Sequence, residues 1–186
     1  MFGRYRLARS RHAAARLEAY EAAREDAIAS HGLGPQLRVA DIDRRAMEVW
    51  HQTWEGRTHA SGAGGWNWPH LFAEHPRRAA VLPLAIWYGS DLCGLALGHA
   101  SRHRAAGVRH TVTLTYAERR PEPPEVPLRK LVIPLAVAVA RNYGLALGAT
   151  RLRLRYPDRN LLWYYELLGF KVAWEDGKPV YCEQEI

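Results

Sequence analysis

The sequence is short of cysteine and of long apolar runs. Its 186 residues include two cysteines, Cys93 and Cys182, which cannot build a disulfide framework, so we expect reduced thiols. The longest apolar run, residues 131–140, contains a proline and is too short to span a bilayer. No apolar segment follows the N-terminal arginines, so we expect no secretory signal and a cytoplasmic protein.

Acidic residues are also scarce relative to basic ones. The chain has 19 Asp and Glu against 26 Lys and Arg, a net charge of +7, and only three of the basic residues are lysines. The excess is largest over residues 81–130, which hold seven basic and four acidic groups. This basic excess favours an acidic partner, such as a phosphate, an anionic lipid or an acidic protein. No segment is a polybasic tail of the kind that marks a nucleic-acid-binding arm. Nucleic acid stays open but no motif specifies it.

Patterns for metal ligation and for nucleophilic cysteine are missing. His99 and His103 are four residues apart, but they fall near a predicted strand end, and no carboxylate or cysteine joins them at ligand spacing. Cys93 has no neighbour in the sequence that would activate its thiol. We therefore expect no metal site and no cysteine nucleophile.

The first third of the chain has mainly helical spacing. Residues 10–31 predict a helix with Ser10 as its N-cap, and its apolar face is approximated by Ala13, Leu17, Tyr20, Ala27 and Ile28. Residues 36–40 favour a short strand, after which Asp41 or Asp43 caps a second helix. Following the glycine-rich residues 61–65, residues 66–72 favour a short helix.

From residue 80 the spacing changes to that of strands. Residues 81–88 and 92–101 flank a turn and predict a hairpin, and residues 108–118 predict a third strand. A proline-rich loop at 119–127 precedes an apolar helix at 131–143, which we expect to end near Gly144. A strand at 150–156, a helix at 160–168 stopped by Gly169, and strands at 170–174 and 179–185 complete the order.

Four local sequences in this order resemble the GCN5-related N-acetyltransferase (GNAT) family. They are residues 37–43, residues 84–94 with Gly94 at the usual hairpin glycine, residues 140–144 followed by 151–154, and the Tyr-Glu-x-x-Gly-Phe element at 165–170. The resemblance implies an α/β (α+β) fold with a mixed, mostly antiparallel sheet flanked by helices. This domain would span residues 36–186, with residues 1–35 as an N-terminal helical extension.

The resemblance also implies acetyl-CoA, or another acyl-CoA, as the acyl donor. In the family a glycine-rich loop at the start of the central helix holds the pyrophosphate on backbone N–H groups, which a helix N-terminus offers unpaired. Here Pro127 and Arg129 fall at the two glycine positions, and Pro124 falls at the family arginine. Proline offers no N–H, and Pro134 is tolerated only in the first turn of the helix.

Two interpretations of this loop stay open. In one, Arg129 and Lys130, with Arg119 or Arg120, replace the backbone donors by charge-assisted contacts. In the other, the CoA site is lost or takes another donor. The residues that the resemblance places at the cofactor are Ala117, Arg119, Leu128, Arg129, Lys130, Leu131 and Asn160.

Direct acyl transfer needs a base for the amine, an acid for the leaving thiolate and a donor for the thioester oxygen. By resemblance Tyr165 is the acid, although the assignment could shift to Tyr164, and both tyrosines could instead be packing residues. Glu118 is the candidate base, directly or through water. Its alternative is a surface carboxylate paired with Arg119 or Arg120. A backbone N–H near Ala117 would take the thioester oxygen.

Four tryptophans lie within nineteen residues and suggest an acceptor site. Trp54, Trp66 and Trp68, with Trp50, could form an aromatic wall for an apolar or cationic acceptor. Core packing is the alternative, favoured for Trp50 and Trp54, whereas Trp66 and Trp68 follow the glycine-rich segment and suit a lid.

An arginine row is predicted on one strand. Arg151, Arg153 and Arg155 alternate, so their side chains share one face. That face meets solvent and acidic neighbours, or it meets an anionic ligand.

The leading hypothesis is an acyl-CoA-dependent N-acyltransferase that transfers an acetyl group to a small-molecule or protein amine by direct attack. One alternative is a catalytically silent GNAT-like binding module. The other takes its acyl group from an acyl-carrier protein, because such proteins are acidic and the basic stretch would steer them. A homodimer is also left open.

Overall fold

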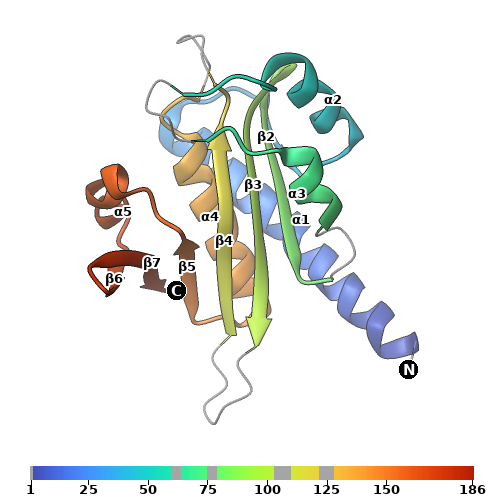
Figure 1. Ribbon diagram of the computed structural model, residues 1–186. Helices are drawn as coiled ribbons and strands as arrows, with labels where there is room; N and C mark the ends of the chain where they lie inside the picture. The colour runs from blue at the N-terminus through green and yellow to red at the C-terminus, as the bar shows by residue number, and fades with distance from the viewer. Residues whose placement is uncertain (1, 60–63, 75–78, 103–109, 122–127) are drawn as a thin grey trace.

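The computed structural model describes residues 2–59, 64–74, 79–102, 110–121 and 128–186, with side chains described from residue 6 onward apart from residue 102. The elements in order are α1 (Phe2–His31), β1 (Leu37–Ala40), α2 (Arg44–Thr53), α3 (Trp68–Glu74), β2 (Val81–Tyr88), β3 (Asp91–Arg102), β4 (His110–Arg119), α4 (Val132–Leu147), β5 (Arg151–Arg155), the 3-10 turn η1 (Arg159–Leu161), α5 (Leu162–Leu167), β6 (Lys171–Glu175) and β7 (Lys178–Glu185). Figure 1 shows the helices on both sides of the sheet.

The strands form one sheet of seven, in the order β1-β2-β3-β4-β5-β7-β6. Neighbouring strands are antiparallel except β4 and β5, which are parallel. The predicted fold class, a mixed and mostly antiparallel sheet flanked by helices, is confirmed. The parallel pair is short: it joins Thr111–Leu114 to Arg151–Leu154, while β4 itself continues to Arg119. Beyond Leu114 the two strands therefore separate.

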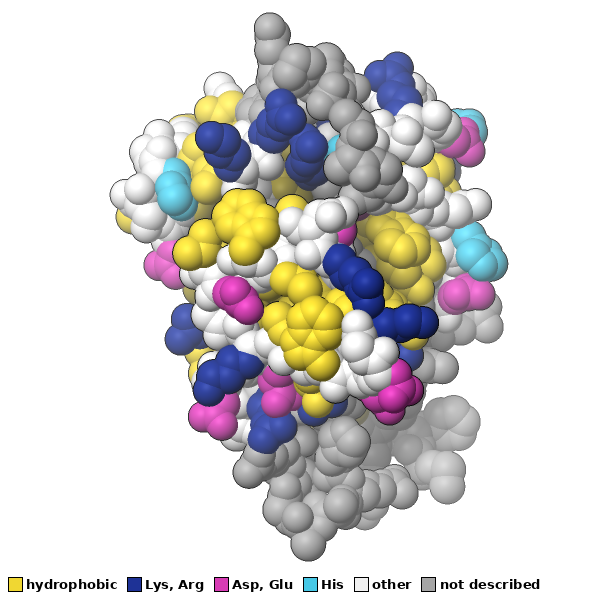
Figure 2. Space-filling view, turned by 60° about the vertical axis from the view of Figure 1, so that its left-hand side comes forward, with side chains coloured by type: hydrophobic (Ala, Val, Ile, Leu, Met, Phe, Trp, Pro, Cys, Tyr) yellow, Lys and Arg dark blue, Asp and Glu magenta, His cyan; other side chains and the backbone are white. Residues whose placement is uncertain are grey.

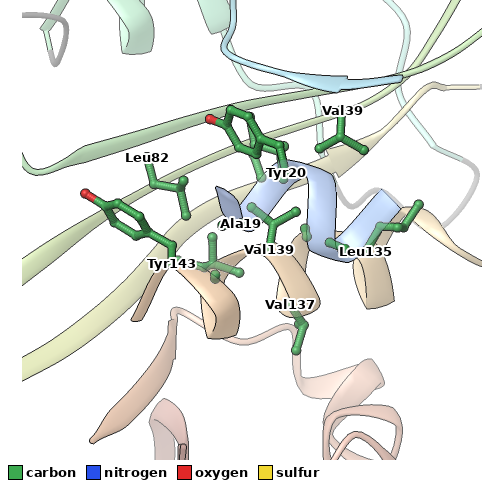
Figure 3. Close-up of a cluster of buried hydrophobic side chains, with 14 of the residues drawn as sticks. Ala19, Tyr20, Val39, Leu82, Leu135, Val137, Val139 and Tyr143 are labelled. Carbon is green, nitrogen blue, oxygen red and sulfur yellow. The ribbon is translucent and has the colours of Figure 1, made fainter. Parts of the chain in front are cut away.

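One face of the sheet is covered by α4 and α1, which pack on each other. The close-up in Figure 3 shows Ala19 and Tyr20 of α1 near Leu135 and Val139 of α4. Small alanines let the two helices approach closely, and α1 is anchored at its middle by Arg16, which bonds Asp41 at 2.9 Å. Residues 1–35 thus include part of the main core, and the division at residue 35 stays a prediction.

The opposite face carries α2 and α3 over a second apolar cluster. Trp50 of α2, Trp54 at its C-cap, Trp68 of α3 and Trp87 of β2 are all buried there. Of the two candidate caps, Asp41 and Asp43, it is Asp43 that caps α2: its carboxylate accepts from the Ala46 backbone N–H at 2.8 Å. Each face of the sheet thus has its own core.

Three expectations for helix limits and faces were wrong. The first helix begins at Phe2, so Ser10 is not its N-cap. Its buried face includes the predicted Tyr20 and Ala27 together with Ala15, Ala19 and Ala23, whereas the predicted Leu17 is 69% exposed. Large apolar side chains dominate a hydropathy pattern, so a face made of alanines is easily missed. The central helix continues past Gly144 and ends at Gly148, which has the left-handed φ of 74° that glycine adopts without strain.

Candidate functional site

The separation of β4 and β5 opens a narrow groove between them. It holds about 150 Å³ and is lined on its walls by Leu114 and Ala117 of β4, Ile133 and Val137 of α4, and Tyr165 of α5. The lining is mostly apolar, with Asp158 and Arg155 among its polar residues. Because β5 no longer pairs with β4 past Leu114, the β4 backbone edge on this side can hydrogen-bond a ligand.

Tyr165 lines this groove, whereas Tyr164 is not among its lining residues. The pKa of Tyr165 is raised to about 12, mainly by burial and also by the nearby Asp158 carboxylate, while a hydrogen bond with the Asp158 backbone acts in the opposite direction. The phenol is therefore protonated throughout the neutral range and available as a hydrogen-bond donor.

Glu118 is buried, with 3% of its surface exposed, rather than a surface carboxylate. It accepts hydrogen bonds from the Gly65 backbone N–H at 2.7 Å and from Trp68 Nε1 at 2.6 Å, and His59 Nε2 lies 3.8 Å away. Burial raises the pKa of Glu118, and these hydrogen bonds lower it in part. The alternative of a surface carboxylate is wrong, and Arg120, one of its two suggested partners, bonds Asp91 instead, at 3.1 Å.

Two glycines shape the backbone around this carboxylate. Gly64 and Gly65 both have positive φ, at 86° and 80°, which side-chain-bearing residues rarely adopt. A Cβ on Gly64 would overlap Glu118 Oε1. Glycine at these positions therefore lets the chain turn tightly over the carboxylate, while residues 61–63 of the predicted glycine-rich stretch lie outside the described part.

The three predicted acceptor tryptophans have different positions. Trp54 and Trp68 are fully buried, so neither forms a wall of the groove, and Trp68 instead donates to Glu118. Trp66 is 40% exposed, lines the groove and meets the Tyr116 ring edge-on, with ring centroids 4.9 Å apart. Of the predicted aromatic wall, the structure brings only Trp66 to the groove.

The turn before α4 uses its own backbone donors. The carbonyl of Leu128 accepts from the N–H groups of Leu131, at 2.7 Å, and of Val132, at 3.1 Å. Leu128 has a φ of 71°, a conformation usual for glycine, and is buried. Arg129 and Lys130 are exposed beside it. Two of the amides that a phosphate would use are thus already bonded, while Pro124 and Pro127 lie outside the described residues.

The remaining predicted cofactor residues are placed around the groove. Ala117 lines it directly, Arg119 ends β4, and Asn160 is exposed on η1 next to the lining residue Leu161. The Asn160 backbone N–H donates to the Asp158 carboxylate at 2.9 Å, and its carbonyl accepts from Trp163 Nε1. The backbone of Asn160 therefore holds the turn between β5 and α5, and its side chain is not part of the groove wall.

The predicted arginine row divides into two kinds. Arg151 bonds Glu183 Oε1 at 2.7 Å, and Arg153 bonds the other oxygen of the same carboxylate. Arg155 instead lies over the Tyr156 ring, 4.7 Å from its centroid, and lines the groove. The predicted acidic neighbour thus exists for the first two arginines.

Several residues at the groove could not be found from the sequence. Ile133 and Val137 belong to an apolar run and Leu114 alternates with threonines, and both patterns are those of any core. Only the separation of β4 and β5 exposes these residues to a cavity. The sequence predicts Arg155 as a member of the arginine row, but its spacing does not distinguish it from Arg151 and Arg153.

Cysteine and metal chemistry find no support in the described ranges. Both cysteines are buried, and burial raises the pKa of Cys93 to about 11, which disfavours a thiolate. Within those ranges no three His, Cys, Asp or Glu side chains are grouped so as to hold a metal ion. Nor is any helix there long and apolar enough to cross a membrane.

Comparisons by sequence give no match, either to a protein-family model or to a curated protein. Solved structures do match. A ribosomal-protein-S18-alanine N-acetyltransferase from Escherichia coli has a TM-score of 0.54 at 15% identity, covering 81% of this chain and 94% of its own. A mutant of the toxin AtaT, bound to the C-terminus of the antitoxin AtaR and to acetyl-CoA, has a TM-score of 0.52 at 14% identity, covering 81% and 93%.

A third structure, a transcriptional regulator from Bacillus halodurans C-125, has a TM-score of 0.58 at 14% identity and covers 76% of this chain and 97% of its own. At such low identity these similarities show the fold alone. This chain therefore shares the fold of that N-acetyltransferase and of AtaT, which is the fold that the sequence resemblance predicted.

Proposed function

We propose that this chain is an acyl-CoA-dependent N-acyltransferase that moves an acetyl group to an amine by direct attack on the thioester. The observation that supports this most is the groove between β4 and β5, narrow and largely apolar, with the protonated Tyr165 on its wall. The thioester end of a slender acyl-pantetheine arm suits a groove of about 150 Å³. AtaT, which shares the fold, is described with acetyl-CoA bound.

The donor would be held chiefly by the β4 edge. Past Leu114 the β4 backbone has no β5 partner, so it can pair with the amides of a pantetheine arm as a strand would. A backbone N–H near Ala117 would then bond the thioester oxygen, which gains negative charge during attack. Neither role depends on the identity of a side chain.

Tyr165 would act on the leaving sulfur. With its pKa at about 12 the phenol is a weaker acid than an ordinary thiol, whose pKa is about 8.5. Full proton transfer to the thiolate is therefore uphill. We infer that Tyr165 stabilises the departing sulfur by a hydrogen bond, and that solvent supplies the final proton.

Glu118 would serve as the base, acting through a water molecule because its carboxylate is buried and already accepts two hydrogen bonds. It follows Ala117 directly on β4 and so points to the other face of the sheet, the face of α2 and α3. Its raised pKa makes the carboxylate a stronger base than an exposed one.

Arg129 and Lys130 would hold the pyrophosphate. The amides of Leu131 and Val132 are occupied by the Leu128 carbonyl, so the phosphate contacts at this turn would come from its exposed cationic side chains. Arg141 offers a matched control, because it is an exposed arginine on α4, nine residues after Val132 and so about 14 Å further along the helix axis at about 1.5 Å per residue.

Titration with acetyl-CoA by calorimetry tests the proposal. We expect saturable binding, weakened at least about tenfold by the double change Arg129→Ala and Lys130→Ala and unaffected by Arg141→Ala. Thiol release should follow when an acceptor amine is added. No binding at millimolar acetyl-CoA would reject the proposal.

The occupied amides also favour two other candidates. In one, the acyl group arrives on an acidic carrier protein, and in the other, the chain only binds a partner. Carrier binding should weaken steeply with salt, because exposed cations such as Lys130 would steer it. Partner binding without thiol release in any amine assay would favour the silent module.

The acceptor would be a small-molecule or protein amine, and the expected location is the cytoplasm. One structure of similar fold is AtaT complexed with acetyl-methionyl-tRNA, with a TM-score of 0.54 at 13% identity, so a nucleic-acid-linked amine is a further candidate. A homodimer stays a prediction.

A further inference from the structure

A second hollow opens on the face of the sheet that carries α2 and α3. It holds about 360 Å³ and is lined by β2, β3, β4 and β5, with Val81, Leu97, His99, Thr115, Tyr116 and Arg155 among its residues. Thr115, Tyr116 and Arg155 also line the narrow groove. The two spaces therefore meet where β4 and β5 separate, and a molecule in the hollow can approach a thioester in the groove.

The charge of the hollow comes from Arg155. In the described ranges no carboxylate lies within ion-pair distance of this guanidinium, whereas Arg151 and Arg153 share the carboxylate of Glu183. The residues that line the hollow include no Asp or Glu. Stacking on Tyr156 holds the guanidinium without neutralising it. On the face in Figure 2, Lys and Arg side chains lie against exposed hydrophobic ones.

Other polar groups at the junction can also donate. Thr115 and Tyr116, whose side chains carry hydroxyl groups, line the hollow together with Arg155. The Tyr116 ring is braced by Trp66, which meets it at an interplanar angle of 70°. A guanidinium with neighbouring hydroxyls is a common site for a carboxylate or a phosphate, because its planar N–H groups match two acceptor oxygens.

We propose that this hollow binds the acceptor through an anionic group, a carboxylate or a phosphate, that the acceptor carries a few bonds from its amine, and that Arg155 is the residue that selects it. The inference rests on the proposed acyltransferase function, because it names the substrate class of the same site. Anchoring the anion at the junction places the amine toward the groove. Neutral amines leave the guanidinium unpaired and bind weakly.

The test measures binding of matched amines without a donor, by calorimetry or NMR titration. The pairs are L-leucine with L-leucinamide and phosphoethanolamine with ethanolamine, so that they separate a carboxylate from a phosphate source. We expect the anionic member of one pair to bind at least about tenfold more tightly than its neutral partner, since hydrogen bonds to a charged group contribute about 1.5–3 kcal/mol.

Variants assign the preference to Arg155. Arg155→Gln should abolish the difference within the pair, and Arg155→Lys should retain part of it, because the charge remains without the planar fork. Arg153→Gln is the matched control: it removes the same charge two residues away on the same strand face, where Arg151 still bonds Glu183. The Arg153→Gln variant should prefer the anionic amine over the neutral one as strongly as the unchanged protein does.

The outcomes separate this inference from the proposed function. If acetyl-CoA binds but both members of each pair bind alike, or if Arg155→Gln leaves the preference intact, the inference is wrong and the acyltransferase proposal stands. If Arg155→Gln weakens acetyl-CoA instead of the amine, Arg155 belongs to the donor and the inference is again wrong. If the anionic amine binds through Arg155 but acetyl-CoA does not bind, only the donor assignment fails.

Discussion

Glu118 and Tyr165 reach the site from opposite faces of the sheet. Tyr165 lines the groove on the face of α4, while Glu118, one residue after the lining residue Ala117, is buried under Trp68 on the face of α2 and α3. Both pKa values are raised by burial, but the consequences differ. Burial keeps the phenol protonated as a donor, whereas it makes the carboxylate easier to protonate and a better base.

Tyr165→Phe should lower kcat about 100-fold and leave acetyl-CoA binding nearly unchanged, because one hydrogen bond that strengthens in the transition state is removed. Thiol release under saturating donor and acceptor measures this. Tyr164→Phe, a neighbouring change outside the groove lining, is the control and should retain full activity. Equal losses in the two variants would place the effect in the packing of α5 instead.

Glu118→Gln should alter how stability depends on pH. The pKa of Glu118 in the folded chain is raised above its ordinary value of 4.5. At a pH between 4.5 and the folded pKa, the chain therefore takes up a proton when it folds. The native protein should therefore lose stability relative to the Gln variant as pH rises from 4.5, until the folded pKa is passed. Urea unfolding at pH 4 to 8 measures the difference, and a pH-independent difference would show that the pKa is not shifted.

At the scale of elements, the start of α4 is set by β3. Gly94 is the hairpin glycine of the GNAT resemblance, and a Cβ there would overlap the Cγ1 of Val132 in the first turn of α4. Leu131 caps that turn without a side-chain hydrogen bond, so packing rather than capping fixes the helix start. The contact between Gly94 and Val132 therefore also positions the groove wall, because the next residue of α4, Ile133, lines the groove.

A double-mutant cycle tests the contact. Gly94→Ala should destabilise the protein by about 1–3 kcal/mol through overpacking, and Val132→Ala by about 2 kcal/mol through the loss of two buried methyl groups. Combined, the two changes should cost less than their sum by about 0.5–2 kcal/mol, since the new methyl group occupies the vacated space. Gly94→Ala with Val139→Ala, a buried change further along α4, should be additive. Additivity in the first pair would contradict a direct contact.

At the scale of the whole molecule, α1 belongs to the core that supports the groove. Its alanine face packs on α4, whose other residues line the groove, and Arg16 and Tyr20 bond Asp41 between β1 and α2. The helix therefore links the two faces of the sheet around its edge. These polar contacts and the close alanine packing explain how a helix with few large apolar residues stays packed on the sheet.

Charging the two sides of α1 tests that role. Ala23→Glu should destabilise the fold by at least about 2 kcal/mol, because it buries a carboxylate against α4. Leu17→Glu on the exposed side should change stability by less than about 0.5 kcal/mol. Thermal or urea unfolding measures both. Equal small effects would support the predicted division at residue 35, with residues 1–35 as a separable extension.

The sequence predicted the fold class, the order of strands and helices, a cap for α2 at Asp41 or Asp43, and Gly169 as the end of α5, because these depend on spacing and local turn chemistry. It also indicated Tyr165 and the unusual loop before α4 by resemblance. It did not predict that Glu118 is buried or that Trp68 binds it, since both depend on contacts between residues fifty positions apart.

Only the tertiary structure separated residues that the sequence treats alike. Trp66 is exposed at the groove and Trp68 is buried two residues later; Arg153 is paired with Glu183 and Arg155 is not. The alternation of a strand fixes which side chains share a face, but the loss of β4–β5 pairing past Leu114 decides which of them meet a cavity. The net charge of +7 was fixed by composition, whereas folding decided the placement of Arg155 at the strand junction, where no carboxylate of the described residues lies within ion-pair distance.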